Sequence, residues 1–515
     1  MKRELFGLFL VMFAFSGYGQ KVVWEKSIGG QHSEYLFDMT STVDYGFLLA
    51  GSSLSDKTGT KKIGGQGSLD YFLWKMDQNG EEEWQWSIGG DGQDILKSIA
   101  MTSDVGYILG GYSDSDKGDY KLVENKGGND LWVVKINAKE GVEWQAGYGG
   151  TGDDRLVEIQ QTSDGGYIIV ASTNSPASEE KQASGFGGLD IWVIKTDNKG
   201  KVEWEKTFGG LYNDEPRSIL QTDKGFIIGA VSNSPVSGNK RKEGFGGYDW
   251  WILELDFKGQ LMNEHVFGSN QDDELNSLLI IESDEGYLLT GNTFATEANG
   301  NFNVAAATDS DFLVVKTDLN FVSQKQYTFD LNGSEFLTST VLLDNDNFLL
   351  SGYKVDKKSR KKSYVSIQVD GEGDVVWKKE LSTDGDDLLR KAVVTRDGGI
   401  VFAGNSDGIK SAHKKTVQGR NDYWIVKLHT RDELRKPEIK IEAFPNPTDG
   451  FTQIVINHEY KEGTVHVFDL NGRLLHSEEL KYDMVIVDLS DYASGTYVIN
   501  VKTNIINTSV KVIKK

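Results

Sequence analysis

Residues 190–210, DIWVIKTDNKGKVEWEKTFGG, carry the pattern that decides the fold. Residues 190–196 and 202–208 are rich in β-branched and aromatic side chains, and such runs favour β-strands. The turn 197–200 between them ends on a glycine, which tolerates the positive φ that tight hairpins require. The stretch therefore predicts a β-hairpin that leads into a pair of glycines.

This hairpin is the second half of a larger unit. Residues 156–162 and 167–173 form two further predicted strands, joined by the turn Ser163-Asp164-Gly165-Gly166. A long loop, 174–189, connects the two hairpins. One unit thus predicts four strands in about sixty residues, and its markers recur along the chain.

The recurrence is regular enough to count copies. The fourth predicted strand carries tryptophans sixty residues apart: Trp24, Trp84, Trp144 and Trp204. The third predicted strand opens on an aspartate in six copies: Asp70, Asp130, Asp190, Asp249, Asp311 and Asp422. Residues 363–368 are a degenerate seventh copy of that strand. These markers predict seven copies between residues 20 and 435.

A four-stranded twisted sheet cannot bury both of its faces alone, so copies of this kind pack radially. We predict an all-β chain with a seven-bladed β-propeller, and six blades are the alternative because the copy at 325–376 is short and irregular. Residues 22–28 read as a lone fourth strand and 422–428 as a lone third strand, so they are expected to complete one sheet. The unit resembles the propeller repeats of secreted bacterial proteins that carry sorting domains.

Composition limits the function. The net charge of −22 argues against nucleic acid as a partner, because phosphates are neutralised by lysine and arginine. The chain has no cysteine, which excludes disulfides and a thiol nucleophile. Residues 1–19 predict a signal peptide, with a basic start, an apolar stretch and small residues before the cleavage site. No later segment is apolar enough to predict a transmembrane span in the mature chain.

After a predicted linker at 436–440, residues 441–515 predict six or seven short strands and a small immunoglobulin-like β-sandwich. This stretch resembles the type A C-terminal sorting domain of the type IX secretion system. The resemblance rests on one set of motif residues: Pro445, Asn446, Pro447, Gly472, Gly495, Lys514 and Lys515. It implies recognition by the secretion machinery, removal by its sortase, and a passenger that is attached to the outer cell surface or released. An accessory binding sandwich is the alternative.

An acidic position lies four residues after each glycine pair or its counterpart. This acidic ring consists of Glu34, Asp94, Asp154, Asp214, Asp273, Glu335 and Asp387. We expect it just before the innermost strand, around the mouth of the central channel. Seven carboxylates there suit Ca²⁺, which prefers oxygen ligands. The alternative, which we favour, is that each carboxylate accepts backbone N–H groups at its own turn.

Two further acidic groups are candidates. The aspartates that open the third strands are expected to fix the glycine-rich loops before them. Asp114, Asp116 and Asp119 alternate as in a Ca²⁺ loop, although Asn125 stands where such a loop places a bidentate glutamate. The loops between second and third strands vary in sequence, and we interpret their lysines, such as Lys61, Lys240 and Lys414, as solvated charge.

Catalytic motifs are absent: no histidine pair has zinc spacing, and no Gly-x-Ser-x-Gly elbow occurs. We expect a secreted or surface-attached binding or adhesion protein that is not an enzyme, with a glycan or a surface protein as partner and Ca²⁺ as the only cofactor the sequence favours. The alternatives are an extracellular hydrolase acting on polysaccharide and a structural surface protein. A fold of this class does not choose among them.

Overall fold

The computed structural model describes residues 20–137, 141–178, 181–281, 286–307, 309–343, 346–429, 441–444, 446–448, 450–456, 460–480 and 484–515. The predicted signal peptide 1–19, the predicted linker 436–440 and Pro445 lie outside these residues. The described chain is all-β. None of its helical segments reaches the length and hydropathy of a membrane span.

Strands β1–β28 pair into seven antiparallel four-stranded sheets. Sheets 1 to 3 contain β2 (Glu34–Ser41), β3 (Phe47–Ser53), β4 (Asp70–Met76) and β5 (Glu82–Ile88); β6 (Asp94–Met101), β7 (Tyr107–Ser113), β8 (Asp130–Ile136) and β9 (Val142–Tyr148); and β10 (Asp154–Gln161), β11 (Tyr167–Thr173), β12 (Asp190–Thr196) and β13 (Val202–Phe208).

Sheets 4 to 7 follow in chain order. They contain β14 (Asp214–Gln221), β15 (Phe226–Ser232), β16 (Asp249–Leu255) and β17 (Leu261–Phe267); β18 (Asp273–Ile281), β19 (Gly286–Thr293), β20 (Asp311–Asp318) and β21 (Ser323–Phe329); β22 (Ser334–Leu342), β23 (Phe348–Val355), β24 (Lys362–Val369) and β25 (Val375–Leu381); and β26 (Asp387–Val394), β27 (Ile400–Ser406), β28 (Asp422–His429) and β1 (Lys21–Ile28).

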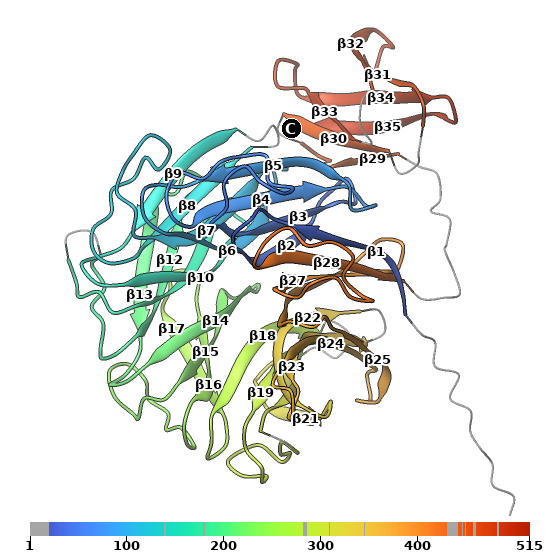
Figure 1. The fold of residues 1–515 in the computed structure, drawn as a ribbon. Coiled ribbons are helices and arrows are strands. Elements are labelled where there is room, and N and C mark those ends of the chain that lie inside the picture. The colour runs from blue at the N-terminus through green and yellow to red at the C-terminus, as the bar shows by residue number, and fades with distance from the viewer. Residues whose placement is uncertain are drawn as a thin grey trace, which may run out of the picture.

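The first strand of each sheet faces the centre of a closed ring. β2, β6, β10, β14, β18, β22 and β26 contact one another in that order, and β26 contacts β2. Figure 1 shows the sheets following one another around this ring, with the blue β1 beside the orange β28. β1 pairs antiparallel with β28, with Ile28 opposite Tyr423, so strands from both ends of the repeat array share sheet 7. The predicted closure by residues 22–28 and 422–428 is confirmed.

Apolar residues of adjoining sheets fill the space between them. One cluster joins Leu48 and Leu73 of sheet 1 to Leu109 and Trp132 of sheet 2, all 0% exposed. The Tyr71 hydroxyl crosses the same boundary and donates to the Trp132 carbonyl oxygen at 2.9 Å. Each such large side chain contributes roughly 1.5–3 kcal/mol through burial, so the sheets depend on their neighbours for a core.

Strand bounds follow the prediction closely in sheet 3, with one difference. β11, β12 and β13 begin and end where the sequence indicates. β10 begins at Asp154, two residues earlier than expected, so the acidic-ring position belongs to the inner strand and does not precede it. The reason is pairing: Asp154 lies opposite Thr173, which extends the ladder to the ends of both strands.

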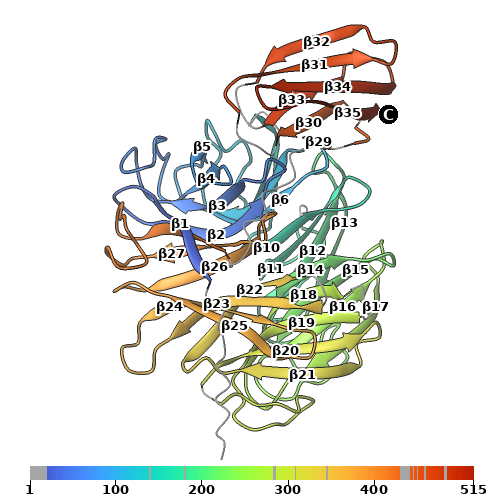
Figure 2. The ribbon, with the colours of Figure 1, turned by 90° about the vertical axis from the view of Figure 1, so that its right-hand side faces the viewer.

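Seven further strands form the C-terminal domain beside the ring (Figure 2). They are β29 (Ile441–Phe444), β30 (Phe451–Ile456), β31 (Gly463–Asp469), β32 (Leu474–Glu479), β33 (Met484–Asp488), β34 (Gly495–Thr503) and β35 (Asn507–Lys514). They pair as one sheet β29-β30-β33 and a second sheet β32-β31-β34-β35. Buried side chains of both sheets, including Ile454, Val467 and Ile499, make a common core.

Candidate functional site

Every inner strand carries a β-bulge at the same place, three residues after the acidic-ring position. A bulge adds one residue to one strand and redirects a side chain. The seven bulged residues, here called the bulge ring, are Phe37, Lys97, Val157, Arg217, Asn276, Thr338 and Arg390, and all line the central cavity. The residue at this position is different in most sheets, whereas the residue before it is leucine in six of the seven.

The central cavity has a volume of about 820 Å³ and is lined by the inner strands of all seven sheets. Sites for small ligands in proteins typically enclose about 300–1,000 Å³. Its lining carries four basic residues, Lys97, Arg217, Arg390 and Lys391, against two acidic residues, Asp38 and Glu158. The cavity is therefore locally positive in a chain whose net charge is −22, and a charged cleft of this kind attracts ions of opposite sign.

Residues directly after the bulges hold neighbouring sheets together. Asp38 Oδ2 accepts a hydrogen bond from Ile99 N at 3.1 Å, and Glu158 Oε2 accepts one from Ile219 N at 2.9 Å. Lys391 Nζ lies 3.1 Å from Asp38 Oδ1, an ion pair between sheets 7 and 1. Asp38 is the main cause that raises the pKa of Lys391, whereas burial raises the pKa of Glu158. The carboxylates of Asp38 and Glu158 are therefore already bonded to groups of neighbouring sheets.

The four cations of the cavity differ in their partners. Arg217 lies 3.1 Å from Glu215 Oε2 and 3.3 Å from Glu274 Oε2. Within the described chain, by contrast, neither Lys97 nor Arg390 has an ion pair, and the buried Nε of Arg390 has no hydrogen-bond partner.

Both of these cations lie against one aromatic ring. Lys97 Nζ is 4.3 Å from the centroid of Phe37, and the guanidinium carbon of Arg390 is 5.9 Å from it. Burial, followed by the charges of Arg390 and Arg217, lowers the pKa of Lys97 to about 8. Burial also lowers the pKa of Arg390. Lys97 and Arg390 are half-buried, and a cation that loses part of its hydration without a counter-ion is costly. A bound anion would relieve that cost at this position.

The acidic ring lies elsewhere, inside the sheets. All seven side chains are 0% exposed, so they do not line an open channel mouth. In the described turns, six of the seven accept a backbone N–H from four residues earlier. Asp154, for example, accepts from Gly150 N at 2.8 Å and from Ser175 Oγ at 2.7 Å. This geometry is the one expected of the structural interpretation. Glu335 is the exception.

The aspartates that open the third strands hold the loops before them in the same way. Asp190 Oδ2 accepts from Phe186 N at 2.8 Å, and Asp249 Oδ2 accepts from Phe245 N at 2.7 Å. Each lies close to an acidic-ring carboxylate of the next sheet, and the two like charges repel each other. Burial, with the charge of that neighbour, raises the pKa of Asp70, Asp130, Asp190 and Asp249 to about 6.

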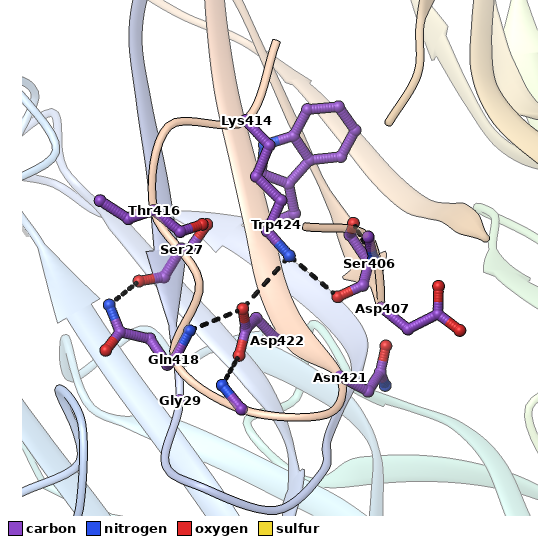
Figure 3. Close-up of polar contacts among 12 residues, drawn as sticks. Ser27, Gly29, Ser406, Asp407, Lys414, Thr416, Gln418, Asn421, Asp422 and Trp424 are labelled. Atoms are coloured by element: carbon purple, nitrogen blue, oxygen red, sulfur yellow. Dashed lines mark hydrogen bonds and ion pairs between the residues drawn. The ribbon is translucent and has the colours of Figure 1, made fainter. Parts of the chain in front are cut away.

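The expectation that the loop lysines are solvated is wrong for Lys61, Lys240 and Lys414, and the lysines at the same place in two further loops are buried as well. Lys61, Lys121, Lys181, Lys240 and Lys414 are at most 2% exposed. Each interacts with the acidic-ring carboxylate and the third-strand aspartate of its own sheet. In sheet 7, Lys414 Nζ lies 3.2 Å from Asp422 Oδ2 and donates to the Ser406 carbonyl oxygen at 3.1 Å (Figure 3). Burial lowers the pKa of Lys61, Lys121, Lys181 and Lys240, and the neighbouring carboxylates oppose this effect because they favour the charged ammonium group.

The alternating aspartates of the loop after β7 do not converge. Asp114 Oδ1 accepts from Gln93 N at 2.5 Å, and Asp116 N donates to Asp91. Asp114, Asp116 and Asp119 are not among the carboxylate groups that come together in the described residues. The one such group lies at another place, between sheets 5 and 6: Asp311, Asp330 and Glu335 have ligand atoms within 4.8 Å of one another.

The motif residues of the C-terminal domain fasten its ends together. Asn446 Nδ2 donates to the Lys511 carbonyl oxygen at 2.6 Å, and its Oδ1 accepts from Ile513 N at 3.0 Å. Lys514 Nζ donates to three carbonyl oxygens, including that of Leu489 at 2.8 Å. Gly472 has a φ of 79° in the hairpin turn between β31 and β32. Asn446 and Lys514 thereby join the last strand, β35, to other parts of the domain.

Comparison with known proteins adds a family for one part of the chain. Residues 442–515 match the family described as "Secretion system C-terminal sorting domain". A regulatory protein, FlaEY of Caulobacter vibrioides, is 23% identical over 202 residues, which are 37% of this chain and 20% of that protein. This chain therefore spans about a fifth of the length of that relative.

Solved structures with a similar arrangement include Sqt1 from Chaetomium thermophilum, with a TM-score of 0.40, 10% identity, and coverage of 80% of this chain and 100% of that one. The extracellular region of plexin A4 has a TM-score of 0.42 and 9% identity, covering 95% of this chain and 61% of that one. The resemblance to a secreted repeat propeller with a sorting domain is confirmed where it concerns the tail and the repeated β-sheets. Through residues 442–515 the chain carries a C-terminal sorting domain of the type IX secretion system, which indicates export to the cell surface or the extracellular space.

Proposed function

We propose that the protein is a secreted binding protein without enzymatic activity, whose central cavity receives a carboxylate or sulfate group of an acidic extracellular glycan. The observation that carries this proposal is the pair Lys97 and Arg390, which lie against Phe37 without a carboxylate partner in the described residues. A carboxylate or sulfate can accept charge-assisted hydrogen bonds from both. Phe37 adds an apolar face to these donors, the combination typical of small-ligand sites.

The proposal includes the finer architecture. The seven sheets are the blades of a closed seven-bladed β-propeller, and residues 441–515 are an immunoglobulin-like sandwich that acts as a type A sorting domain. Residues 1–19 are a cleaved signal peptide. The sortase of the secretion system removes the sorting domain and leaves the propeller at the outer cell surface or in the medium. A rigid ring with one variable position per blade suits recognition, because the scaffold keeps the binding side chains in place.

Binding to immobilised oligosaccharides tests this function. The purified protein is applied to uronate-containing, sulfated and neutral oligosaccharides at pH 7, alongside the variants Lys97→Met and Arg390→Met. A charge-assisted hydrogen bond contributes about 1.5–3 kcal/mol, so each variant should bind acidic oligosaccharides about 10- to 150-fold more weakly. Lys199→Met removes an exposed lysine from a turn outside the cavity and is the control.

Selective binding of acidic oligosaccharides that both cavity variants weaken and Lys199→Met does not would support the proposal. Equal binding of neutral and acidic oligosaccharides would contradict it. So would undiminished binding by both cavity variants, or no binding at all.

A further inference from the structure

The boundary between sheets 5 and 6 departs from the other sheet boundaries. At five boundaries, the third-strand aspartate of one sheet and the acidic-ring carboxylate of the next sheet lie on either side of a glycine. This glycine stands five residues before the acidic-ring carboxylate. These five sets are Asp70, Gly89 and Asp94; Asp130, Gly149 and Asp154; Asp190, Gly209 and Asp214; Asp249, Gly268 and Asp273; and Asp422, Gly29 and Glu34. The equivalent set between sheets 5 and 6 is Asp311, Asp330 and Glu335, with the same spacing.

The glycine has a steric reason at the other boundaries. A Cβ at Gly89, Gly149, Gly209 or Gly268 would lie between 1.6 and 1.9 Å from an oxygen of the preceding third-strand aspartate. A side chain therefore does not fit beside the carboxylate pair in its usual arrangement. Asp330 occupies this place nevertheless and brings a third carboxylate to the pair. This boundary therefore has an additional carboxylate where the other boundaries have a closely packed glycine.

The buried loop lysine of the other boundaries is missing from this one. Each of the other five pairs interacts with at least one buried lysine from the loop between second and third strands. In sheet 5 the equivalent position, nine residues before Asp311, is Phe302, which is 3% exposed. In sheet 6, residues 356–361 form a short loop without a buried lysine. Three carboxylates thus converge where the lysine that balances the other pairs is absent.

Glu335 points into this cluster, where its carboxylate faces that of Asp311. Its side chain is 0% exposed, and neither carboxylate oxygen has a hydrogen-bond partner among the described residues. The Leu331 N–H lies close enough to lower the pKa of Glu335 in part, but it does not complete the hydrogen bond made at this place in the other sheets. Burial and then the charges of Asp311 and Asp330 raise the pKa of Glu335 to about 7.

We propose that Asp311, Asp330 and Glu335 bind a calcium ion between sheets 5 and 6. Their ligand atoms lie within 4.8 Å of one another. Oxygens on opposite sides of a calcium ion with bonds of 2.3–2.6 Å are about 4.6–5.2 Å apart, and adjacent ones are closer. Asp330 is exposed, so water can complete the six to eight ligands that calcium takes.

The contacts around the cluster fit this role. Asn332 N donates to Asp330 Oδ1 at 2.6 Å and orients that carboxylate, while Ala307 N donates to Asp311 Oδ2 at 2.6 Å. Lys378 Nζ donates to the Leu331 carbonyl oxygen at 2.9 Å, and its charge acts on Glu335 and Asp330 without an ion pair to either of them in the described residues. Calcium would supply here the charge that a buried lysine supplies at five other boundaries and would bridge sheets 5 and 6.

Isothermal titration of the chelator-treated full chain with CaCl₂ tests the site. The variant Asp330→Gly restores the glycine of five other boundaries and should fold. Asp91→Gly removes an exposed aspartate from the related turn of sheet 2 and is the matched control. We expect one site with a Kd at or below about 10⁻³ M, the range of extracellular calcium modules. We expect at least tenfold weaker binding by Asp330→Gly and none of this loss in Asp91→Gly.

A second variant and a second readout keep the test decisive. Phe302→Lys returns the missing lysine and should also weaken calcium binding. Calcium should raise the unfolding temperature of the wild type and of Asp91→Gly, but not that of Asp330→Gly. No saturable binding below about 10 mM CaCl₂, tenfold above the weakest such modules, would overturn the proposal. Wild-type affinity in Asp330→Gly would also overturn it.

Discussion

Replacing Lys181 by methionine tests the view that each buried lysine balances the charge of the two buried carboxylates of its own sheet. Lys181 is 0% exposed, interacts with Asp154 and Asp190, and lies 5.2 Å from the ring centroid of Trp192. Methionine keeps most of the volume and removes only the charge. Two buried carboxylates then lack their cation, and breaking a buried pair in this way costs about 3–5 kcal/mol.

The loss should depend on pH in a defined direction. The folded chain holds a proton on Asp190 up to a pKa of about 6, above the ordinary value of 3.8. A raised pKa of an acid means that stability is greatest at low pH and falls as the pH rises through this interval. At pH 5 Asp190 is largely neutral and one of the two uncompensated charges is gone. The deficit of Lys181→Met should therefore be larger at pH 8 than at pH 5.

Thermal unfolding followed by circular dichroism at both pH values measures this effect. Lys199→Met, which removes an exposed lysine of the same sheet, is the control and should change stability by no more than about 0.5 kcal/mol. If Lys181→Met unfolds at the temperature of the control at pH 8, the charge-balance argument fails. A deficit that grows toward pH 5 would contradict it as well.

Three further predictions concern the boundaries, the carboxylate pairs and export. Gly209→Ala places a Cβ 1.8 Å from Asp190 Oδ1 and should cost about 1–3 kcal/mol in chemical denaturation, whereas Gly118→Ala, with open space around it, should be close to neutral. Asp190→Asn keeps an oxygen that accepts the Phe186 N–H and removes the charge. The stability of this variant should therefore rise less from pH 8 to pH 5 than that of the wild type. An unchanged pH profile would assign the pH dependence of stability to other groups. Deleting residues 441–515 should retain the protein inside the producing cell, as measured by fractionation, and normal delivery to the surface or medium would contradict the role of the sorting domain.

The sequence repeat made most of the fold predictable. Strands such as Tyr167–Thr173 and Val202–Phe208 were predictable because alternation and glycine turns mark both of their ends. The closing pair β1 and β28 followed from two incomplete units at the ends of the array. The start of β10 at Asp154 was missed, because a polar residue at a strand end gives no apolar signal.

The site was predictable only in part. The acidic ring was found from its recurrence, and its backbone hydrogen bonds agree with the structural interpretation. The bulge ring was missed, because a bulge leaves no mark in a single strand and Lys97 or Arg390 alone reads as surface charge. One signal was present: the third residue after the acidic position varies between copies, whereas the second is leucine in six of the seven.

The buried lysines had a signal of another kind. Lys61, Lys121, Lys181 and Lys240 each stand nine residues before a third-strand aspartate, a spacing that solvated loop residues have no reason to keep. Phe302 at the same spacing, together with Asp330 in place of a glycine, marks the boundary where we infer a calcium site. Departures from a repeat were therefore more informative about function than the repeat itself.

The pH dependence of binding to a sulfated oligosaccharide, compared between the wild type and Lys97→Met, tests the role of the central cavity most directly. The pKa of Lys97 is lowered to about 8, so its charge is lost as the pH rises through that value. A sulfate keeps its own charge throughout. Wild-type affinity should therefore be constant below pH 7 and fall between pH 7 and pH 9, while the weaker binding by Lys97→Met should not change over this range. A wild-type affinity that is the same at pH 7 and pH 9, or a fall of equal size in Lys97→Met, would contradict the account.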